Sequence, residues 1–191
     1  MFNRKSFTLL SMPPRNGLSG LYTIDRTRST VGFSVHHAMA SHAQGEFTEF
    51  EGLIKIGGNR SRSEAYLSVQ TYSAETGSPS LNAQVSGSEF LDAATFPVMS
   101  FRSNGFLDTR AERLRLSGFF RIKDIELPVP VDLAFVGASH DKCGQERVNF
   151  EGTVDLLSSD WGLDWATSPI SYKMRLRLGI SAVRLDPARA A

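Results

Sequence analysis

The chain has 191 residues, of which 41% are hydrophobic, so it is long enough for one domain with a substantial core and short for two. Its 21 Lys and Arg residues nearly balance its 20 Asp and Glu residues, which excludes a global field that would recruit nucleic acid or an anionic membrane. A single cysteine excludes a disulfide within the chain and suits a reducing compartment, so we expect a cytoplasmic protein.

Residues 1–19 are expected to form a loose leader. Their apolar run, residues 7–10, is shorter than the core of a signal peptide, and no later stretch is long enough to span a bilayer as a transmembrane segment. Alternation of apolar and polar residues begins near Leu21. We therefore expect one folded domain over residues 20–185 and a short C-terminal tail over residues 186–191.

Three of the four histidines lie close together near the start of this domain, and their spacing argues against a metal site. In a strand, His36 and His37 point to opposite faces, and His42 follows His37 at a spacing that zinc helices do not use. His140 and Cys143 are the only other candidate ligands. We expect no bound metal and no cofactor.

Period-two alternation predicts eight or nine strands, each with one buried and one solvated face. In the clearest of them, Leu114, Leu116 and Phe120 share one face, whereas Arg113 and Arg115 share the other. The predicted strands are residues 20–25, 29–37, 46–56, 65–72, 98–106, 112–123, 128–136, 147–157 and 170–180.

Residues 78–97 depart from the strand pattern. They contain few β-branched residues and open with Pro79, which predicts a short helix, weakened by Gly87, and a loop. Strands in this number avoid open edges by closing on themselves or by pairing as a sandwich. The expected fold class is all-β, an antiparallel barrel of about eight strands with the helix and loop covering one mouth.

Several short motifs follow one another in a characteristic order. They are Tyr22, Ile24 and Asp25, then Phe33, Ser34, Val35 and His37, then Gly45 and Phe47, then SEFLDAATFPVMSFRSNGF, DWGLDW and ISAVR. Over about residues 20–184 the chain thus resembles the YceI family of lipocalin-like polyisoprenoid-binding proteins. The resemblance implies an extended antiparallel β-barrel that holds a long-chain isoprenoid or related amphiphile, with no obligatory metal or cofactor.

The chain also departs from the family pattern. The stretch LNAQVSG replaces a run that usually carries Arg, Asp and His, and Ser158 stands where an Arg is common. The loop ATSPISYK is shorter than its usual counterpart. Because Arg grips phosphate through two parallel hydrogen bonds, these changes weaken the expectation of a pyrophosphate head group.

The leading hypothesis is a barrel that binds and carries or sequesters a long-chain apolar metabolite, with no nucleic-acid partner; a homodimer is left open. The thirteen phenylalanines and the apolar strand faces support it, although a barrel filled by its own side chains has the same composition. The ligand-binding residues we expect are Phe33, Val35, His37, Phe50, Leu67, Phe101, Phe120, Phe135, Phe150, Trp165 and Leu176, with His37 near a polar end.

The alternative is a biosynthetic enzyme, a cyclase or isomerase of a polyene or polyketide chain, that uses the same cavity to fold its substrate. Asp164 follows Trp161 closely, and a carboxylate beside an indole can have a raised pKa and act as an acid. The catalytic candidates in that case are Asp164, His37, Tyr172 and Glu89. The sequence does not decide between carrier and enzyme.

Overall fold

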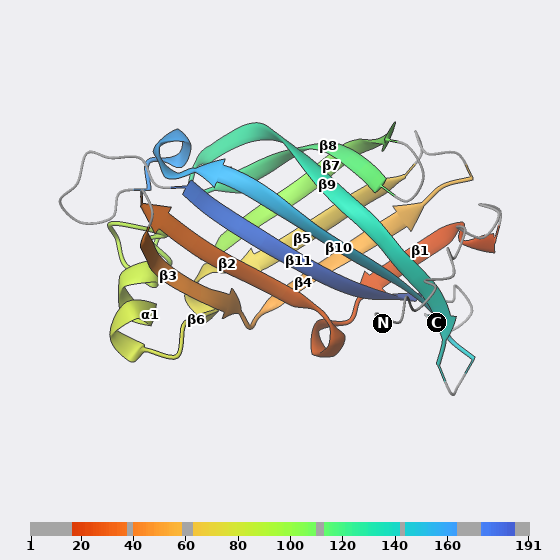
Figure 1. Cartoon of the computed structure of the whole chain (residues 1–191), viewed down its shortest axis with the longest axis horizontal. Coiled ribbons are helices and arrows are strands. Elements are labelled where there is room, and N and C mark those ends of the chain that lie inside the picture. Colours follow the sequence, from red (N-terminus) through yellow and green to blue (C-terminus); the bar gives the residue numbers. More distant parts are fainter. Residues whose placement is uncertain are drawn as a thin grey trace, which may run out of the picture.

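The computed structural model describes residues 17–37, 40–58, 63–109, 113–141, 144–163 and 173–185. These residues form a strand-rich barrel with one α-helix (Figure 1). The strands are β1 (Gly20–Ile24), β2 (Thr30–His37), β3 (Ala40–Phe47), β4 (Phe50–Ile56), β5 (Glu64–Gln70), β6 (Ala74–Glu75), β7 (Val98–Thr109), β8 (Arg113–Ile122), β9 (Ile125–His140), β10 (Glu146–Leu157) and β11 (Lys173–Arg184). The helix is α1 (Pro79–Ser86), and three short 3-10 helices are η2 (Arg26–Arg28), η4 (Thr71–Ser73) and η5 (Ser158–Trp161).

The barrel closes through antiparallel pairing alone. The ring runs in the order β1, β4, β5, β7, β8, β9, β10 and β11, and β11 returns to pair with β1. The expectation of an all-β antiparallel barrel of about eight strands is therefore confirmed. Closure gives every strand of the ring two neighbours, so the described part of the ring has no free edge.

At three positions around the barrel, two consecutive strands lie end to end and together take the place of one long strand. β1 and β2 pair with β11 at different heights, Ala182–Arg184 and Lys173–Gly179 respectively. In the same way β4 pairs with β1 whereas β3 pairs with β2, and β5 pairs with β4 whereas β6 pairs with β3. The predicted strand over residues 46–56 is accordingly divided between β3 and β4.

Hydrogen bonds stabilise the short segments that connect the two strands of each such pair. At the first break, Asp25 caps η2 by accepting a bond from the Thr27 N–H, and the Asp25 N–H donates to the Ser181 carbonyl. At the others, the Ser73 carbonyl accepts a bond from the Thr48 N–H, and the Ser73 hydroxyl donates to the Gln70 carbonyl. The walls bend at these positions without leaving these backbone groups unpaired.

Alternation decides which side chains face the barrel interior. In β10, Val148, Phe150 and Val154 are buried, whereas Glu151 and Thr153 between the last two are exposed. On the outer face, Arg115 forms two hydrogen bonds with Asp132, and Arg175 forms two with Asp155, each across adjacent strands. The outer arginines of β8 and β11 thus include two that are neutralised by neighbouring carboxylates.

The helix α1 lies at the end of the barrel where β2 and β3 meet β6 (Figure 1). It ends at Ser86, and the N–H of the capping Gly87 donates to the Gln84 carbonyl; the sequence predicts a short helix in this segment. Val85 on α1 and Phe90 and Leu91 just after it are buried among the barrel side chains. The segment therefore covers this mouth and also contributes to the core.

One strand that the alternation does not predict is β3. Its inner positions are occupied by Ala43, Gly45 and Phe47, of which only the last is a large apolar residue. The register between β2 and β3 shifts after Val35, so His42 is left out of the pairing.

No helix in the described part of the chain is long and apolar enough to cross a bilayer.

Candidate ligand-binding site

Glycines on the inner face of the barrel let large side chains lie flat against its wall. At each of four inner positions, a Cβ atom on the glycine would lie 3.0 Å or less from a side-chain atom of a neighbouring strand. The pairs are Gly45 with Phe33 (Cζ at 3.0 Å from the Cβ position), Gly52 with Ile24 (Cδ1 at 2.6 Å), Gly118 with Phe101 (Cζ at 2.5 Å) and Gly152 with Leu133, the tightest of the four. A backbone carbonyl of a neighbouring strand also lies close to each Cβ position, so the glycines allow both the strands and these side chains to approach closely.

The expected ligand-binding residues form short rows across adjacent strands. Leu67 of β5 lies opposite Phe101 of β7, which in turn lies opposite Phe120 of β8. The Phe101 and Phe120 ring centroids are 6.4 Å apart. A second row joins Phe33 of β2 to Leu176 of β11. The structure thus brings these predicted residues together on the inner face.

A third group lies on β9 and β10. Phe135 lies opposite Phe150, with ring centroids 5.6 Å apart and an interplanar angle of 62°. Phe50 of β4 is also buried, and Val35 of β2 lies opposite Met174 of β11. All of these positions face inward, as alternation predicts.

Several expected site residues lie beyond what the structure describes. Asp164, Trp165 and Tyr172 fall outside the described residues, and so does the side chain of His37. Glu89 is described, and it is exposed in the turn that follows α1. Among the described residues, then, no catalytic candidate from the sequence is placed in the barrel interior.

The end of the barrel beneath α1 contains a cavity of about 20 Å³. Its walls combine predicted residues with residues that the sequence reasoning missed. The lining residues are Phe33, Val35, Phe47, Val85, Phe90, Leu91, Met99, Phe120, Ile122, Leu156, Met174 and Leu176. Strand alternation alone could have identified Ile122, Leu156 and Met174. Nothing in the local pattern singles out Val85, which lies on α1, or Phe90 and Leu91, which lie in the turn after it.

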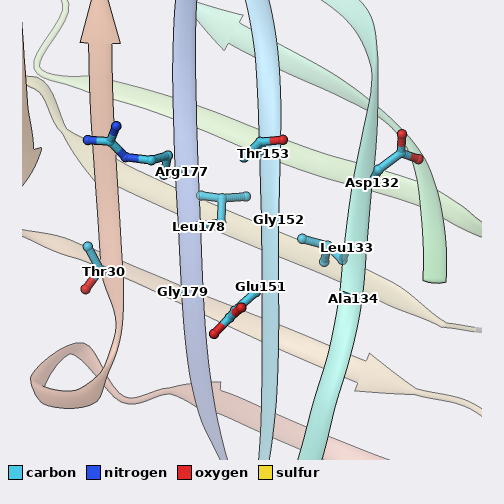
Figure 2. A pocket seen from close by; sticks show the side chains of 10 residues that line it. All are labelled: Thr30, Asp132, Leu133, Ala134, Glu151, Gly152, Thr153, Arg177, Leu178 and Gly179. Carbon is cyan, nitrogen blue, oxygen red and sulfur yellow. The ribbon is translucent and has the colours of Figure 1, made fainter. Parts of the chain in front are cut away.

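A larger hollow of about 630 Å³ lies over β9, β10, β11 and β2 (Figure 2). It is lined by Thr30, Asp132, Leu133, Ala134, Glu151, Gly152, Thr153, Arg177, Leu178 and Gly179. All of these strands are neighbours on one side of the barrel, and six of the ten residues are exposed, so the hollow opens to solvent. Its charged rim suits an apolar chain less well than the barrel interior does.

A little-exposed ion pair lies near β1, at the opposite end of the barrel from α1. Arg147 donates to Asp25 at 2.8 Å, and the two side chains are 11% and 20% exposed. Hydrogen bonds from Thr27 and then Arg147 lower the pKa of the Asp25 carboxyl below its usual range. Burial, followed by the nearby Glu146 carboxylate, raises the pKa of Tyr22 to about 12. These side chains link η2 to the ends of the neighbouring strands, so their role is structural.

The acidic and imidazole side chains of the described residues do not gather as metal ligands. Within those ranges there is no group of three or more His, Cys, Asp or Glu side chains that could hold an ion. His36 lies opposite Lys173, and His140 is exposed at the end of β9; Cys143 lies outside the described residues. The inner face is lined mainly by apolar side chains, which can bury apolar surface.

Comparison with protein families gives a match to the YceI-like domain over residues 22–182. Among curated proteins, a UPF0312 protein of Azotobacter vinelandii is 25% identical over 166 residues, which cover 85% of this chain and 86% of the relative. A UPF0312 protein of Vibrio cholerae is 26% identical over 145 residues, which cover 74% of this chain and 77% of the relative.

Solved structures show the same fold at low sequence identity. BcnA of Burkholderia cenocepacia superimposes with a TM-score of 0.73 at 18% identity, covering 83% of this chain and 98% of that protein. A polyisoprenoid-binding domain of Saccharophagus degradans, implicated in plant cell wall breakdown, gives a TM-score of 0.67 at 14% identity and covers 86% of this chain and 98% of that domain.

Proposed function

Because the chain belongs to the family of YceI-like domains, we propose that its barrel binds a long-chain apolar metabolite along the interior and carries or sequesters it. The observation that carries this proposal is the set of inner-face glycines. At Gly52, Gly118 and Gly152, a side chain from the adjacent strand lies against the wall where a Cβ would otherwise be. Each of these glycines contributes no side chain of its own to the interior, which supports a lumen that a ligand can share.

Binding of an apolar chain in the barrel requires no charged group. Burial of a hydrocarbon tail contributes roughly 0.8 kcal/mol per methylene, so about ten methylenes supply about 8 kcal/mol before the costs of association and ordering. The inner faces of β2, β8, β10 and β11 offer Phe, Leu, Val and Met side chains to such a tail. Affinity then grows with the length of chain that the barrel can enclose.

The class of ligand we propose is an isoprenoid-like chain. Support comes from the Saccharophagus degradans domain of the same fold, which is described as polyisoprenoid-binding. The sequence differences at LNAQVSG and Ser158 remove charged side chains that a pyrophosphate would use, so the proposed ligand is recognised mainly by its apolar part.

The biosynthetic alternative has no comparable support. Glu89 is the one catalytic candidate whose side chain is described, and it is exposed beside α1 and absent from the lining of the cavity beneath it. A general acid or base must lie within hydrogen-bond reach of the reacting group. The carrier therefore remains the proposal.

Native mass spectrometry of protein purified from its own host tests it. We expect a fraction of the protein to carry an added mass that organic extraction identifies as a long-chain apolar compound. A compound that is consumed on incubation would favour the enzyme. Protein that carries no apolar compound, and takes up none when isoprenoid and fatty-acyl chains are added, would contradict the proposal.

A further inference from the structure

Exposed apolar side chains gather on one side of the outer wall of the barrel, over β1, β4 and β5. Eight large apolar side chains of the described residues are exposed, and four of them lie on this side. They are Leu21, Leu53, Tyr66 and Leu185, with exposed fractions between 39% and 43%. Contiguous exposed apolar patches mark interaction surfaces, whereas apolar side chains that are scattered singly need no explanation.

The pairing of the strands makes these four side chains neighbours. Leu53 of β4 lies directly opposite Tyr66 of β5 on one side and Thr23 of β1 on the other. Leu21 is two residues before Thr23, so it lies on the same outer face. Leu185 donates its backbone N–H to the Leu21 carbonyl, which places the two leucines side by side. The four side chains therefore form one patch, called here the outer patch.

Four charged side chains border the outer patch, and their charges balance. Lys55 of β4 and Glu64 of β5 form an exposed ion pair with an N–O distance of 3.7 Å. Glu51 of β4 and Arg102 of β7 are also exposed, and within the described ranges neither side chain has an ion pair. Two basic and two acidic groups give no net charge, which argues against an anionic membrane or a nucleic acid as the partner.

The order of residues along β4 makes the outer patch complementary to itself. Glu51, Leu53 and Lys55 follow one another on the outer face, with opposite charges on the two sides of the leucine. A two-fold axis that crosses the strands at Leu53 reverses this order in a second copy. Glu51 of each copy then faces Lys55 of the partner subunit, and the apolar side chains meet between these two charge pairs.

The convex outer wall of a barrel limits such a contact to a few strands. With β4 and β5 at the centre, Arg102 on β7, which lies opposite Tyr66, falls at the rim. The symmetry brings the two copies of Arg102 toward the same axis, and a rim position leaves them in solvent, where their repulsion is screened. Stable dimers bury roughly 800 Å² per partner, so a narrow contact of this kind gives a weak, reversible dimer.

We propose that the outer patch binds a second copy of this chain. The contact is isologous, with Leu53 and Tyr66 at its centre and reciprocal pairs of Glu51 with Lys55 on either side. It lies outside the barrel, so it is independent of any ligand in the interior. It assigns a specific surface to the homodimer that the sequence left open.

Sedimentation equilibrium of the full chain over a range of concentrations measures the association. We expect the average mass of the wild-type protein to rise with concentration from 21.0 kDa toward twice that value. Leu53→Asp should keep the protein monomeric, because it places two like charges at the centre of the contact. Val136→Asp is the matched control. Val136 is 50% exposed on β9, outside the outer patch, so this change should leave the association unaltered.

Charge reversal tests the symmetry of the contact separately from its apolar centre. Glu51→Lys and Lys55→Glu should each weaken the association about tenfold, because each creates two repulsive pairs across the axis. The variant that carries both changes restores opposite charges and should recover most of the loss. Arg102→Ala should leave the association unchanged or strengthen it. All these side chains are exposed, so the denaturant midpoints should stay close to that of the wild type.

Three results would overturn the inference. The first is a wild-type protein that stays at the monomer mass at every concentration; flotation of that monomer with vesicles of phosphatidylcholine and phosphatidylglycerol would assign the outer patch to a bilayer instead. The second is a dimer that Leu53→Asp leaves intact, which must use another surface. The third is a double variant of Glu51 and Lys55 that associates as weakly as the single variants, which excludes the reciprocal charge pairs.

Discussion

The side chain of Leu133 occupies the space that a Cβ atom on Gly152 would need. Its Cδ2 atom lies closer to that position than any van der Waals contact allows, and the Asp132 carbonyl oxygen is 2.5 Å away on the same side. The two residues lie opposite each other on β9 and β10. The glycine is therefore what allows the leucine to lie flat against the wall of the barrel.

Gly152→Ala should destabilise the protein, because the added methyl group displaces both Leu133 and the β9 backbone. Overpacking of this kind costs roughly 1–3 kcal/mol. Urea denaturation of the substituted and wild-type proteins measures the difference. In a double-mutant cycle with Leu133→Ala, the two changes should be less than additive, since the smaller side chain relieves part of the collision.

Gly179→Ala is the matched control for that experiment. Gly179 lies on β11, and a Cβ there would meet only the Thr30 Cβ at 3.9 Å, an ordinary contact. We expect little change in stability. Equal losses from the two substitutions would show that strand glycines are required for a reason other than the side chains that lie over them.

Asp25→Asn should lower stability at neutral pH, because buried Arg147 would lose its charged partner. The pKa of Asp25 is lowered in the folded state, so its contribution is present above the ordinary Asp pKa and is lost as the pH falls through the lower folded value. The difference in unfolding free energy between wild type and variant should therefore shrink below about pH 4. A difference that stays constant down to strong acid would contradict the assigned ion pair.

Tyr22→Phe should change how the stability of the protein depends on pH in the alkaline range. The Tyr22 hydroxyl donates to the Leu18 carbonyl, and the pKa of Tyr22 is raised from 10.0 to about 12. A raised folded pKa gives stability that is complete below pH 10 and is lost as the pH rises toward 12. We expect the wild type to be the more stable protein near neutrality and its advantage to decline over that window. A pH-independent difference would argue against the buried phenol.

Phe135→Trp and Phe120→Trp should differ in their effects. Phe120 lines the cavity of about 20 Å³, which has no room for a larger ring, so its replacement should lower the denaturant midpoint. Phe135 packs with Phe150 away from that end, and a larger ring there should weaken binding of a long apolar chain more than it weakens the fold. Strong destabilisation by both substitutions would indicate an interior filled by its own side chains.

The closed barrel was predictable from the sequence because one face of most strands is continuously apolar. The alternation matches the buried and exposed positions of β8 and β9, of β10 from Phe150 onward and of β11 as far as Leu176, whereas Ile180, Ser181 and Ala182 of β11 are all buried. The pattern fails at β3, since Ala43 and Gly45 occupy inner positions there without an apolar signature. Pairing with β2 and β6, a tertiary effect, places that segment in the wall.

The candidate site was only partly predictable. Phe33, Val35, Phe120 and Leu176 follow from alternation and line the cavity beneath α1. Val85, Phe90 and Leu91 reach the same cavity from a helix and a turn, whose position over the mouth depends on long-range packing. Leu18 is also buried, and its carbonyl accepts the local hydrogen bond from the Tyr22 hydroxyl, although the residues around it lack any alternation. Contacts made across the barrel leave no periodic signal in the sequence.

The most direct test of a ligand-binding interior is the affinity of the purified protein for a series of apolar chains that differ only in length. Each methylene that enters the barrel should contribute roughly 0.8 kcal/mol, a factor of about four in the dissociation constant, until the enclosed length is reached. The account predicts this steady gain followed by a plateau, with Phe135→Trp moving the plateau to a shorter chain. Affinity that does not depend on chain length, or an absence of binding across the whole series, would contradict it.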